Sequence, residues 1–426
     1  MTHEKDCAPR AAYLQTEGRT RFRKETTRMG TLRRRYAMWM SGLALMGLGG
    51  ATAQAQTLVW LGALDGRASE ARGVSADGTV VVGVHYNQND NPRAFRWTRT
   101  GGMELLPSLG GLTSTAHAVS ADGALTVGWA DDERGYPRAA LWVEDGGGFF
   151  PTPFPIFSEA YAIDPDGTHF AGYAYNRSYT QAACLWDGGI YQDLGVLPGS
   201  AWSEARGLSE NGQVATGFSS VGNDWKPVRW VNDVIQPLGY PQLRSGWAAG
   251  VSVDGRIIAG TVQTLWGENF AVRWVDGAPQ TLGRLPDYSF VGGIAGDGQT
   301  VVGAGGFRAF RWTPTRGLED LNRAFRQVVG NSVLEYAYAV SPDGRYIVGQ
   351  GRDAESGQYL AYLLDTWRTG DANGDGCIDD ADLLAVLFAF GGAGTGDARH
   401  EDIDKDGIVD DADLLSVLFA FGQGCN

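Results

Sequence analysis

One sequence pattern recurs seven times along this chain, at intervals of 43 to 46 residues. It reads Ala-x-(Gly/Ala)-Val-Ser-x-Asp-Gly-x-x-x-Val-Gly, followed by a loop and then by Ala-Phe-Arg-Trp. A fixed period over several copies restricts a chain to repeat architectures, in which each copy is one supersecondary unit. The Asp or Asn before the turn glycine marks the copies at Asp77, Asp122, Asp166, Asn211, Asp254, Asp297 and Asp343.

Each copy predicts four short strands. In the first copy, Asp77-Gly78 supplies the turn of a hairpin, because Asp tolerates and Gly favours a positive φ. The β-branched run from Thr79 to Val84 predicts the second strand, and Arg93 to Thr98 alternates as the third. The fourth, Met103 to Leu106, follows a Gly-Gly turn. Four strands in about 44 residues are typical of a β-propeller blade, so we expect an all-β, seven-bladed propeller over residues 56–366.

The two ends of the repeat region predict how the ring closes. The last copy ends at its third strand, Tyr359 to Asp365, whereas Thr57 to Leu64 has the Leu-Gly-x-Leu ending of a fourth strand with no blade before it. We therefore predict that this N-terminal strand completes the seventh blade, which removes exposed sheet edges. The Ala-x-(Gly/Ala)-Val strand, rich in small residues, is then the innermost strand of each blade.

The repeats resemble the HAF-type extracellular repeat over roughly Leu61 to Asp365. The resemblance implies a secreted β-propeller. It is compatible with a lectin-like or protein-binding role, and it implies no particular reaction.

Residues 1–55 predict a secretory signal peptide with an extended N-terminal region. Arg33 to Arg35 precede an uncharged stretch, and Ala-x-Ala patterns follow it. The stretch of about 14 residues is shorter than the roughly 20 that span a bilayer, although a membrane anchor remains an alternative. Translation starts at either Met1 or Met29. We expect a secreted protein, extracellular or associated with the cell surface, with no membrane span in the mature chain.

The charge balance indicates which classes of partner to expect. The whole chain carries a net charge of -14, and without residues 1–55 there are 25 basic and 45 acidic residues, a balance of -20. An acidic excess repels phosphate backbones, so a nucleic-acid partner is not expected, whereas cations are.

Two acidic loops follow in residues 367–426. Both place oxygen ligands at loop positions 1, 3, 5 and 12 and a glycine at position 6, and the backbone carbonyl at position 7 adds a ligand, as Ca²⁺ coordination requires. The spacing predicts two Ca²⁺ sites. Their ligands are Asp371, Asn373, Asp375, Cys377 and Asp382 in the first loop, and Asp402, Asp404, Asp406, Ile408 and Asp413 in the second.

Each loop leads into a nearly identical apolar helix, and the paired EF-hand-like units resemble a type I dockerin over Gly370 to Cys425. The resemblance implies a small all-α, calcium-binding domain whose partner is a cohesin-like or other cell-surface or scaffold protein. Unlike the cellulosomal pattern, this copy has Asp380-Ala381 and Asp411-Ala412 late in its loops. We expect the apolar helix faces to pack mainly against each other, which leaves the partner open.

The cysteines support an oxidising compartment. Cys377 and Cys425 lie near the two ends of the C-terminal segment and predict a disulfide. Cys184 lies in an apolar strand and is interpreted as a buried free thiol.

Candidate site residues lie where inner strands begin. Glu70, Glu159 and Glu204 each occur in Ser-Glu-Ala, and in the ring they gather near one channel mouth. They are candidate catalytic carboxylates, but their recurrence favours a structural role at the start of the strand. Trp202 and Trp247 are candidate ligand-binding aromatics on the same face, with core packing as the alternative. The repeated Trp97 and Trp230 are expected in the blade core.

Three functions follow. The first is a secreted, non-catalytic binding or interaction propeller that is anchored through its dockerin-like module and binds a glycan or protein on its face. The second is a polysaccharide-degrading glycoside hydrolase or lyase. The third is a structural surface or matrix protein.

Overall fold

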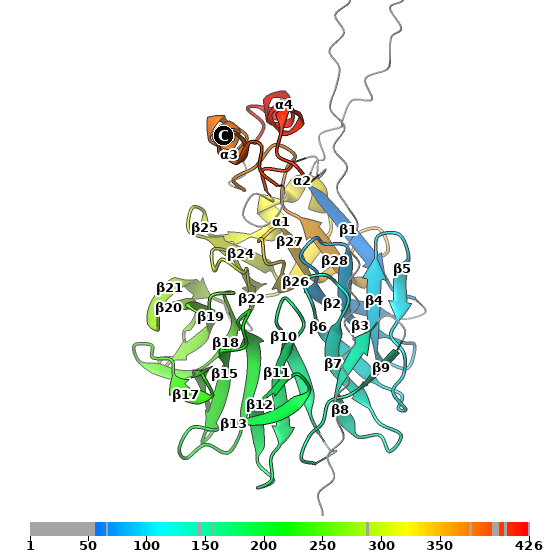
Figure 1. The fold of residues 1–426 in the computed structure, drawn as a ribbon, viewed down its shortest axis with the longest axis vertical. Coiled ribbons are helices and arrows are strands. Elements are labelled where there is room, and N and C mark those ends of the chain that lie inside the picture. Colours follow the sequence, from blue (N-terminus) through cyan, green and yellow to red (C-terminus); the bar gives the residue numbers. More distant parts are fainter. Residues whose placement is uncertain are drawn as a thin grey trace, which may run out of the picture. The chain divides into compact units, whose positions relative to one another are not determined.

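The computed structural model describes residues 56–424 except 65–66, 144–145, 155–156, 287–288, 375–376, 394–399 and 404–406. In the described residues, 28 strands form five four-stranded sheets and one eight-stranded sheet. The larger sheet divides into two groups of four that meet at a single parallel pair, Ala68 with Tyr359. The strands therefore form seven groups of four, which we number as blades 1 to 7, and Figure 1 shows their succession along the chain.

The strands of each blade are antiparallel, and in blades 1 to 6 they are consecutive in sequence. Blade 1 holds β2 (Ala68–Val74), β3 (Val80–Tyr86), β4 (Pro92–Thr98) and β5 (Gly102–Leu105). Blade 2 holds β6 (Ser114–Val119), β7 (Thr126–Asp131), β8 (Pro137–Val143) and β9 (Gly146–Phe149). Blade 3 holds β10 (Glu159–Ile163), β11 (His169–Tyr175), β12 (Gln181–Asp187) and β13 (Ile190–Gly195). Blade 4 holds β14 (Ser203–Leu208), β15 (Val214–Val221), β16 (Asp224–Val231) and β17 (Val234–Pro237).

Blades 5 to 7 repeat this plan. Blade 5 holds β18 (Leu243–Val251), β19 (Ile257–Thr264), β20 (Asn269–Val275) and β21 (Ala278–Leu285). Blade 6 holds β22 (Phe290–Ile294), β23 (Val301–Ala304), β24 (Ala309–Thr313) and β25 (Gly317–Asp320). Blade 7 holds β26 (Val333–Val340), β27 (Tyr346–Arg352), β28 (Tyr359–Asp365) and the N-terminal β1 (Thr57–Gly62). Two short helices, α1 (Leu321–Ala324) and α2 (Arg326–Val329), connect β25 to β26.

The predicted closure of the ring is confirmed. β1 pairs antiparallel with β28, with Thr57 opposite Asp365. Figure 1 shows the blue N-terminal strand beside orange β28, although about 300 residues separate them in sequence. The first strands are innermost, as predicted, because residues from the first strand of every blade line one common channel.

A conserved backbone feature of the seven copies explains the glycine that ends each Val-Gly sequence. Every inner strand has a register shift in its pairing with the second strand. The glycine of the second strand lies opposite the inner-strand residue just before this shift, and against the backbone carbonyl of the residue that precedes that one. A Cβ at Gly217 would lie 1.9 Å from the Glu204 carbonyl oxygen, and at the other six positions the distance is 1.8 to 2.2 Å. No side chain fits there, so this glycine is fixed by packing. The seven are Gly83, Gly128, Gly172, Gly217, Gly260, Gly303 and Gly349.

The Ser-x-Asp-Gly turns form one face of the propeller, which we call the lower face. In blade 1, the Ser75 hydroxyl donates to Asp77 Oδ1 at 2.7 Å and accepts from the Val80 amide at 3.0 Å. The first strand of each blade runs toward this face. The opposite face, the upper face, therefore carries the starts of the inner strands and the loops between second and third strands.

The blade cores contain the repeated tryptophans, as predicted. Trp97 and Trp230 are buried, and so are their counterparts in blades 2, 3 and 5. Each core lies between neighbouring blades, since the cluster around Trp230 also includes Leu185 of blade 3. Cys184 is a buried free cysteine, which confirms its interpretation, and burial raises the pKa of its thiol.

The C-terminal segment contains two helices, α3 (Asp380–Ala389) and α4 (Asp411–Ala420). Each begins with a capping box, in which Asp379 and Asp410 are the N-cap residues. No helix in the described part of the chain is long and apolar enough to cross a membrane. Residues 1–55 and Cys425 lie outside the described residues, so the signal peptide and the Cys377–Cys425 disulfide stay predictions.

Candidate functional site

Two layers of side chains from the inner strands face the upper part of the channel. Each inner strand begins near the position of the serine in Ser-Glu-Ala. Because strand side chains alternate in direction, the residue after that position and the residue two places later both point to the channel. The first layer consists of Glu70, Thr115, Glu159, Glu204, Trp247, Phe290 and Tyr336. The second layer consists of Arg72, His117, Tyr161, Arg206, Ala249, Gly292 and Tyr338.

These layers are asymmetric around the ring. Blades 1 to 4 contribute the charged and polar members, whereas blades 5 to 7 contribute aromatic rings together with Ala249 and Gly292. Because these two small residues leave the second layer unfilled, a cavity of about 550 Å³ opens at the upper mouth of the channel. It is lined by Arg72, His117, Tyr161, Trp202, Glu204, Arg206, Phe218, Trp225, Trp247, Ala249, Ser289, Phe290, Val291, Gly292 and Tyr338.

Glu204 and Arg206 form an ion pair in the cavity wall. Glu204 Oε2 accepts from Arg206 Nε at 3.0 Å and from Nη2 at 2.6 Å, while Gln181 donates to Oε1 at 3.1 Å. Burial raises the pKa of the Glu204 carboxyl, and Arg206 offsets part of this effect. The Arg206 guanidinium also lies 3.9 Å from the ring centre of Tyr161, a cation–π contact that fixes its position.

Glu159 lies behind the cavity surface, in contact with His117. His117 Nε2 is 3.4 Å from Glu159 Oε2, and the Tyr173 hydroxyl donates to Oε1 at 3.2 Å. Burial alone would raise the pKa of Glu159, but its interactions with His117, Tyr161 and Tyr173 outweigh that effect and leave the pKa below its ordinary value. Burial lowers the pKa of His117, so this imidazole is neutral near pH 7.

Glu70 holds Arg72 at the opposite side of the polar wall. Arg72 Nη2 donates to Glu70 Oε2 at 2.7 Å, and the Tyr86 hydroxyl donates to Oε1 at 3.2 Å. Arg72 Nε is buried and has no hydrogen-bond partner within the described residues. A buried donor without a partner is costly, so the cavity presents a position for an acceptor atom.

The aromatic wall is built mainly from blades 4 and 5. Trp225 stacks on Phe218 at 5.0 Å between ring centres, and it makes edge contacts with Trp202 at 6.2 Å and Trp247 at 5.8 Å. These contacts fix the ring planes. Trp225 remains 40% exposed, so one part of this cluster stays open to solvent.

The structure brings three of the five sequence candidates into one cavity: Glu204, Trp202 and Trp247 line it directly. Glu70 and Glu159 instead contact the lining residues Arg72 and His117. Trp247 lies inside β18 rather than before it. Sequence reasoning missed Arg72, His117 and Arg206, although their position, aligned over the seven copies, differs from blade to blade as much as the position of the candidate glutamates does.

The Ser-Glu-Ala recurrence has a separate explanation in its serine. Ser203 Oγ accepts from the Ala183 amide of blade 3 at 2.8 Å and donates to the Gly195 carbonyl at 2.7 Å. Ser69, Ser114 and Ser158 accept from the equivalent amide of the preceding blade at 2.9 to 3.0 Å. The serine therefore joins neighbouring blades, while the glutamate beside it points to the channel.

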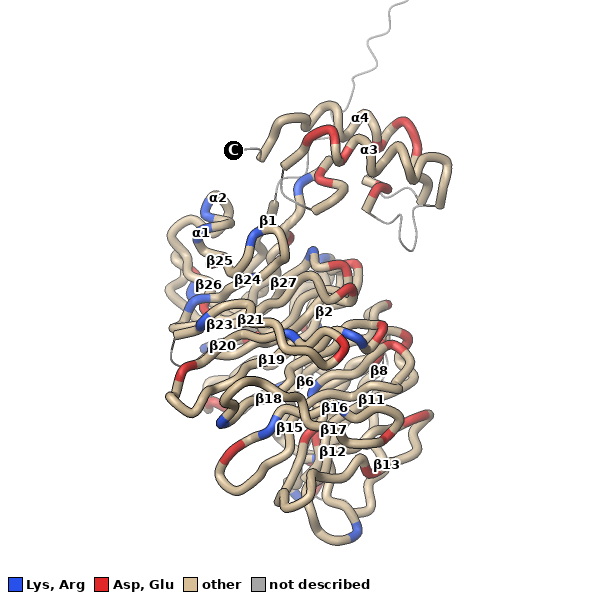
Figure 2. The backbone as a smooth tube through the Cα atoms, turned by 90° about the vertical axis from the view of Figure 1, so that its left-hand side faces the viewer, with Lys and Arg blue, Asp and Glu red and all other residues tan. Residues whose placement is uncertain are grey.

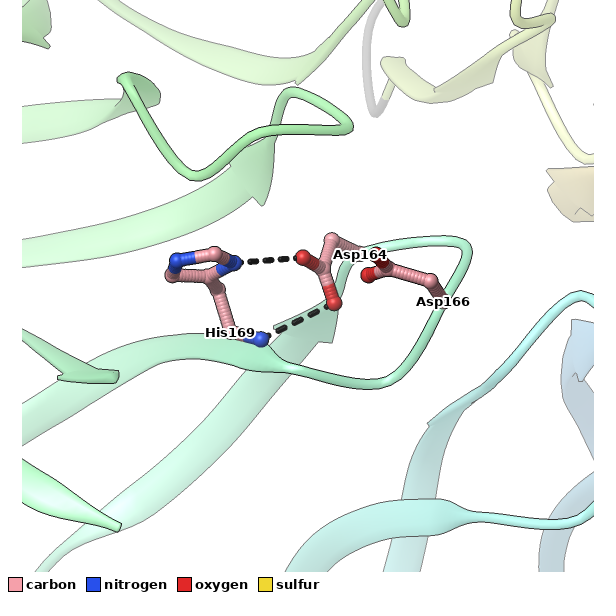
Figure 3. A group of neighbouring side chains, drawn as sticks. All are labelled: Asp164, Asp166 and His169. Atoms are coloured by element: carbon pink, nitrogen blue, oxygen red, sulfur yellow. Dashed lines mark hydrogen bonds and ion pairs between the residues drawn. The ribbon is translucent and has the colours of Figure 1, made fainter. Parts of the chain in front are cut away.

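One group in the described residues has metal-ligating side chains close together: Asp164, Asp166 and His169, drawn in Figure 3. Asp164 stands where five of the other six copies have the turn serine. Its Oδ1 accepts from the Thr168 and His169 amides at 2.8 and 2.9 Å, and its Oδ2 lies 2.6 Å from His169 Nδ1. The carboxylate thus performs the hydrogen bonding of the serine it replaces, which accounts for the cluster without an ion.

The C-terminal loops place four of the predicted calcium ligands in buried positions: Asp371, Asp382, Asp402 and Asp413. Asp382 Oδ1 accepts from the Asn373 amide at 3.0 Å, and Asp413 Oδ1 accepts from the Ile403 amide at 2.6 Å. Each loop therefore closes back on its last carboxylate. Asp375, Asp404 and Asp406 lie outside the described residues, whereas Asn373, Cys377 and Ile408 lie within them. Buried carboxylate oxygens are the donor type that a hard cation requires.

The two helices do not bury their apolar faces as expected. Val386 and Val417 pack in a shared core with Ile378. The large side chains next to these valines are exposed, and Phe388 and Phe419 have exposures of 87% and 84%. Mutual packing therefore uses only a narrow stripe of each helix. Figure 2 marks the acidic positions around α3 and α4.

The seven four-stranded blades around one channel define the class of this molecule as a β-propeller protein. No family profile matches the sequence, and no curated protein matches it significantly. Among solved structures, it is similar to an oligogalacturonate lyase from Vibrio parahaemolyticus, with 9% identity, coverage of 73% of this chain and 93% of that one, and a TM-score of 0.50. This likeness concerns the fold alone.

Two further structures have lower scores. The β-propeller domain of Cps50 (Swd1) from Myceliophteria thermophila has 12% identity over 73% of this chain and 98% of that one, with a TM-score of 0.43. TolB from Acinetobacter baumannii has 16% identity over 52% of this chain and a TM-score of 0.38. The match covers 53% of that TolB chain, about half of its length.

Proposed function

We propose that this protein is a secreted, non-catalytic binding protein whose propeller holds a glycan in the cavity at the upper mouth of its channel. The observation that carries the proposal is the pairing of two unlike walls around one cavity. Arg72, Arg206 and Glu204 form the polar wall, while Trp247 and Phe290 stand on the aromatic side. A sugar ring has an apolar face for stacking and hydroxyl groups for hydrogen bonds, so it matches both walls at once.

The charge of the cavity favours a neutral sugar. The two guanidinium groups are already paired with Glu70 and Glu204, and His117 is neutral near pH 7. The residues beyond position 55 carry a net charge of -20, which repels a polyanion. Neutral hydroxyl groups can still accept from Arg72 Nε, because a hydrogen bond to a charged donor does not require a charged acceptor.

The geometry favours binding over hydrolysis of a glycosidic bond. Hydrolysis by the common mechanisms needs two carboxyl groups that flank the bond, and of the three candidate glutamates only Glu204 lines the cavity. Its carboxylate accepts two hydrogen bonds from Arg206. Each of the other two glutamates is similarly engaged, by Arg72 and Tyr86 or by His117 and Tyr173.

The C-terminal segment adds a calcium-dependent attachment module in this proposal. Asp371, Asn373 and Asp382 would hold one ion, and Asp402 and Asp413 the other, together with the ligands predicted from the loop spacing. Calcium supplies charge neutralisation and cross-links each loop. Between Gly370 and Asn426 there are thirteen acidic and two basic residues, so bound cations relieve strong repulsion. The dockerin-like pattern and the exposed helix phenylalanines support a protein partner on a scaffold or cell surface.

A glycan array tests the binding function. We expect the secreted protein to retain neutral glycans without releasing reducing sugar. The variant Ala249→Leu fills the cavity and should abolish retention, whereas Ile190→Ala, on the lower face, should bind like the wild type. Reducing-sugar release that disappears in Glu159→Gln or Glu204→Gln would instead establish a glycosidase. If the protein shows neither glycan retention nor sugar release, a structural role is the function that remains.

Thermal melting with and without a chelator tests the calcium module. Calcium that binds only the folded module raises its melting midpoint by mass action. We expect a separate C-terminal transition to shift down in chelator and to be lost in Asp382→Ala, while the propeller transition stays in place. A C-terminal transition indifferent to both changes would contradict the assignment. Capture of native secreted proteins on the calcium-loaded full chain, compared with the chelated one, tests the partner.

A further inference from the structure

The exposed aromatic side chains in the described part of the propeller lie on one face. Among its described residues, seven aromatic side chains are at least 40% exposed, and every one lies on an upper-face loop or at the first residues of a strand that starts there. The exposed large side chains at the lower turns, such as Val143, Ile190 and Val234, are aliphatic. The seven are Tyr136, Phe157, Tyr179, Trp225, Trp266, Phe307 and Tyr359. We call them the aromatic rim.

Several members of the rim contact a second aromatic ring. Tyr179 stacks on Phe154 with 4.3 Å between ring centres and 22° between planes. Tyr136 and Phe157 make an edge contact at 6.0 Å. A ring that is fixed in orientation loses little conformational freedom when a ligand stacks on it. The rim therefore offers prepared surfaces around the cavity.

Backbone conformation gives an independent sign that the rim is maintained for a ligand. Tyr179 has a φ of +57° in a turn where its amide donates to the Asn176 carbonyl. The same turn position is a glycine in blades 2 and 5, Gly135 and Gly267, with φ values of +79° and +80°. A bulky side chain in this conformation costs folding free energy. Phe307 of blade 6 also has a positive φ, at +60°.

We propose that the glycan bound at the channel mouth is a polysaccharide chain, which places one sugar in the cavity and neighbouring sugars on the aromatic rim. This inference rests on the proposed function and specifies its ligand. The cavity provides hydrogen bonds and charge, whereas the rim provides only stacking faces. Successive pyranose rings of a neutral chain repeat the same apolar face, so a set of rings at different blades can bind one chain and gain affinity with length.

Calorimetric titration with cello-, xylo- and manno-oligosaccharides of one to six residues tests the inference. For at least one series we expect the affinity to rise by at least tenfold between two and six residues. Trp266→Ala and Tyr179→Gly should each weaken hexasaccharide binding by about fivefold, the effect of one lost stacking contact. Both variants should leave disaccharide binding unchanged. Val234→Ala, on the lower face, is the matched control.

Tyr179→Gly separates binding from folding. Relief of the strained φ offsets the lost stacking on Phe154, so we expect a melting midpoint within about 2 °C of the wild type. A midpoint well below that range would show that Tyr179 serves the fold and would overturn its assignment to the rim.

The failures of the two proposals are distinguishable. Equal affinity for disaccharides and hexasaccharides, or hexasaccharide binding unchanged in both rim variants, would overturn the chain-binding inference while the cavity function stands. Wild-type protein that binds no member of the three series would also overturn the inference. The glycan array, with Ala249→Leu as its control, then decides separately whether the proposed function survives.

Discussion

The two faces of the propeller use the same seven repeats in opposite ways. On the lower face, the copies have nearly the same turn, and each turn glycine is packed against the neighbouring blade. A Cβ at Gly78 would lie 2.7 Å from the Tyr346 ring, and one at Gly123 would lie 2.6 Å from the Val80 side chain. On the upper face, the copies differ in their loops between the second and third strands and at most positions of the two channel-facing layers. Repetition on the lower face stabilises the closed ring, and divergence on the upper face provides the proposed binding site.

The lower turns are also linked by backbone hydrogen bonds from blade to blade. The Ala76 amide donates to the Ala121 carbonyl at 2.9 Å, and the Ala121 amide donates to the Pro165 carbonyl at 3.0 Å. The pattern continues from Glu210 through Val253 and Gly296 to the Pro342 carbonyl. Pro165 and Pro342 have no amide hydrogen, so each interrupts the series.

The largest effect is expected where the backbone contact is closest. Gly217→Ala places a Cβ 1.9 Å from the Glu204 carbonyl oxygen, so the inner strand of blade 4 must move. We expect a loss of about 4 kcal/mol in the free energy of unfolding, the upper range for a single substitution. Urea unfolding measures it. Gly146→Ala is the control, because its Cβ would meet nothing within 4 Å. Equal stability of the two variants would refute the packing explanation.

Next in size is the loss of a cavity wall on the upper face. Trp247→Ala removes a ring that Trp225 contacts at 5.8 Å. We expect neutral glycan affinity to fall by about tenfold, which corresponds to about 1.4 kcal/mol. Affinity measurements on an array-selected glycan test this, with Val234→Ala as the lower-face control. Unchanged glycan affinity together with a large loss of stability would mean that Trp247 is a core residue. It would also contradict the division in which the lower face stabilises the ring and the upper face binds the ligand.

A smaller effect is expected from the serine that joins neighbouring blades. Ser203→Ala leaves the Ala183 amide of blade 3 without its acceptor in a buried position. Removal of one partner of a buried hydrogen bond costs about 1 to 3 kcal/mol. Urea unfolding should place this variant between Gly217→Ala and the wild type. Ser178→Ala, on an exposed loop, should be neutral. A neutral Ser203→Ala would leave the recurrence of Ser-Glu-Ala unexplained.

The same division explains how much the sequence predicts. The sequence predicts the blades from the repeat period and the Asp-Gly turns, because turn chemistry is local and repeated. It predicts the closure of the ring from the unmatched strand that begins at Thr57. The gathering of Trp202, Trp247 and Glu204 follows from their common place before or within inner strands. The cavity itself depends on Ala249 and Gly292, whose small size matters only once seven blades face one axis.

Other features were beyond sequence reasoning for physical reasons. Strand alternation places Arg206 and Glu204 on one side, but their ion pair and its place in the cavity wall depend on side-chain conformations that only the structure shows. Asp164 replaces the turn serine and binds His169, so its role is visible only from its hydrogen bonds. The exposure of Phe388 and Phe419 depends on how α3 and α4 cross, which their near-identical sequences do not specify.

The smallest expected effect comes from the titration of His117 and Glu159, on the variable upper face. Burial holds the pKa of His117 below its ordinary 6.5, and Arg72 and Arg206 act in the same direction. Below pH 6.5 the unfolded chain therefore binds more protons at this residue, so stability falls on acidification until the folded pKa is reached. The pKa of Glu159 is below its ordinary 4.5, so its contribution is present above pH 4.5 and is lost as the pH falls through the folded pKa.

Urea midpoints between pH 3.5 and 7.5 measure these two windows. We expect the wild-type midpoint to fall in both, and His117→Gln to flatten the upper window while the lower one persists. Glu159→Gln should flatten the lower window, and the upper window should widen, because His117 loses the carboxylate that raises its folded pKa and that pKa then moves further below 6.5. The lower-face turns also contain carboxylates with lowered pKa values, such as Asp77 and Asp254. If Glu159→Gln leaves the acid dependence of the urea midpoint unchanged, the acid sensitivity comes from those turns. It then belongs to the conserved lower face rather than to the binding face.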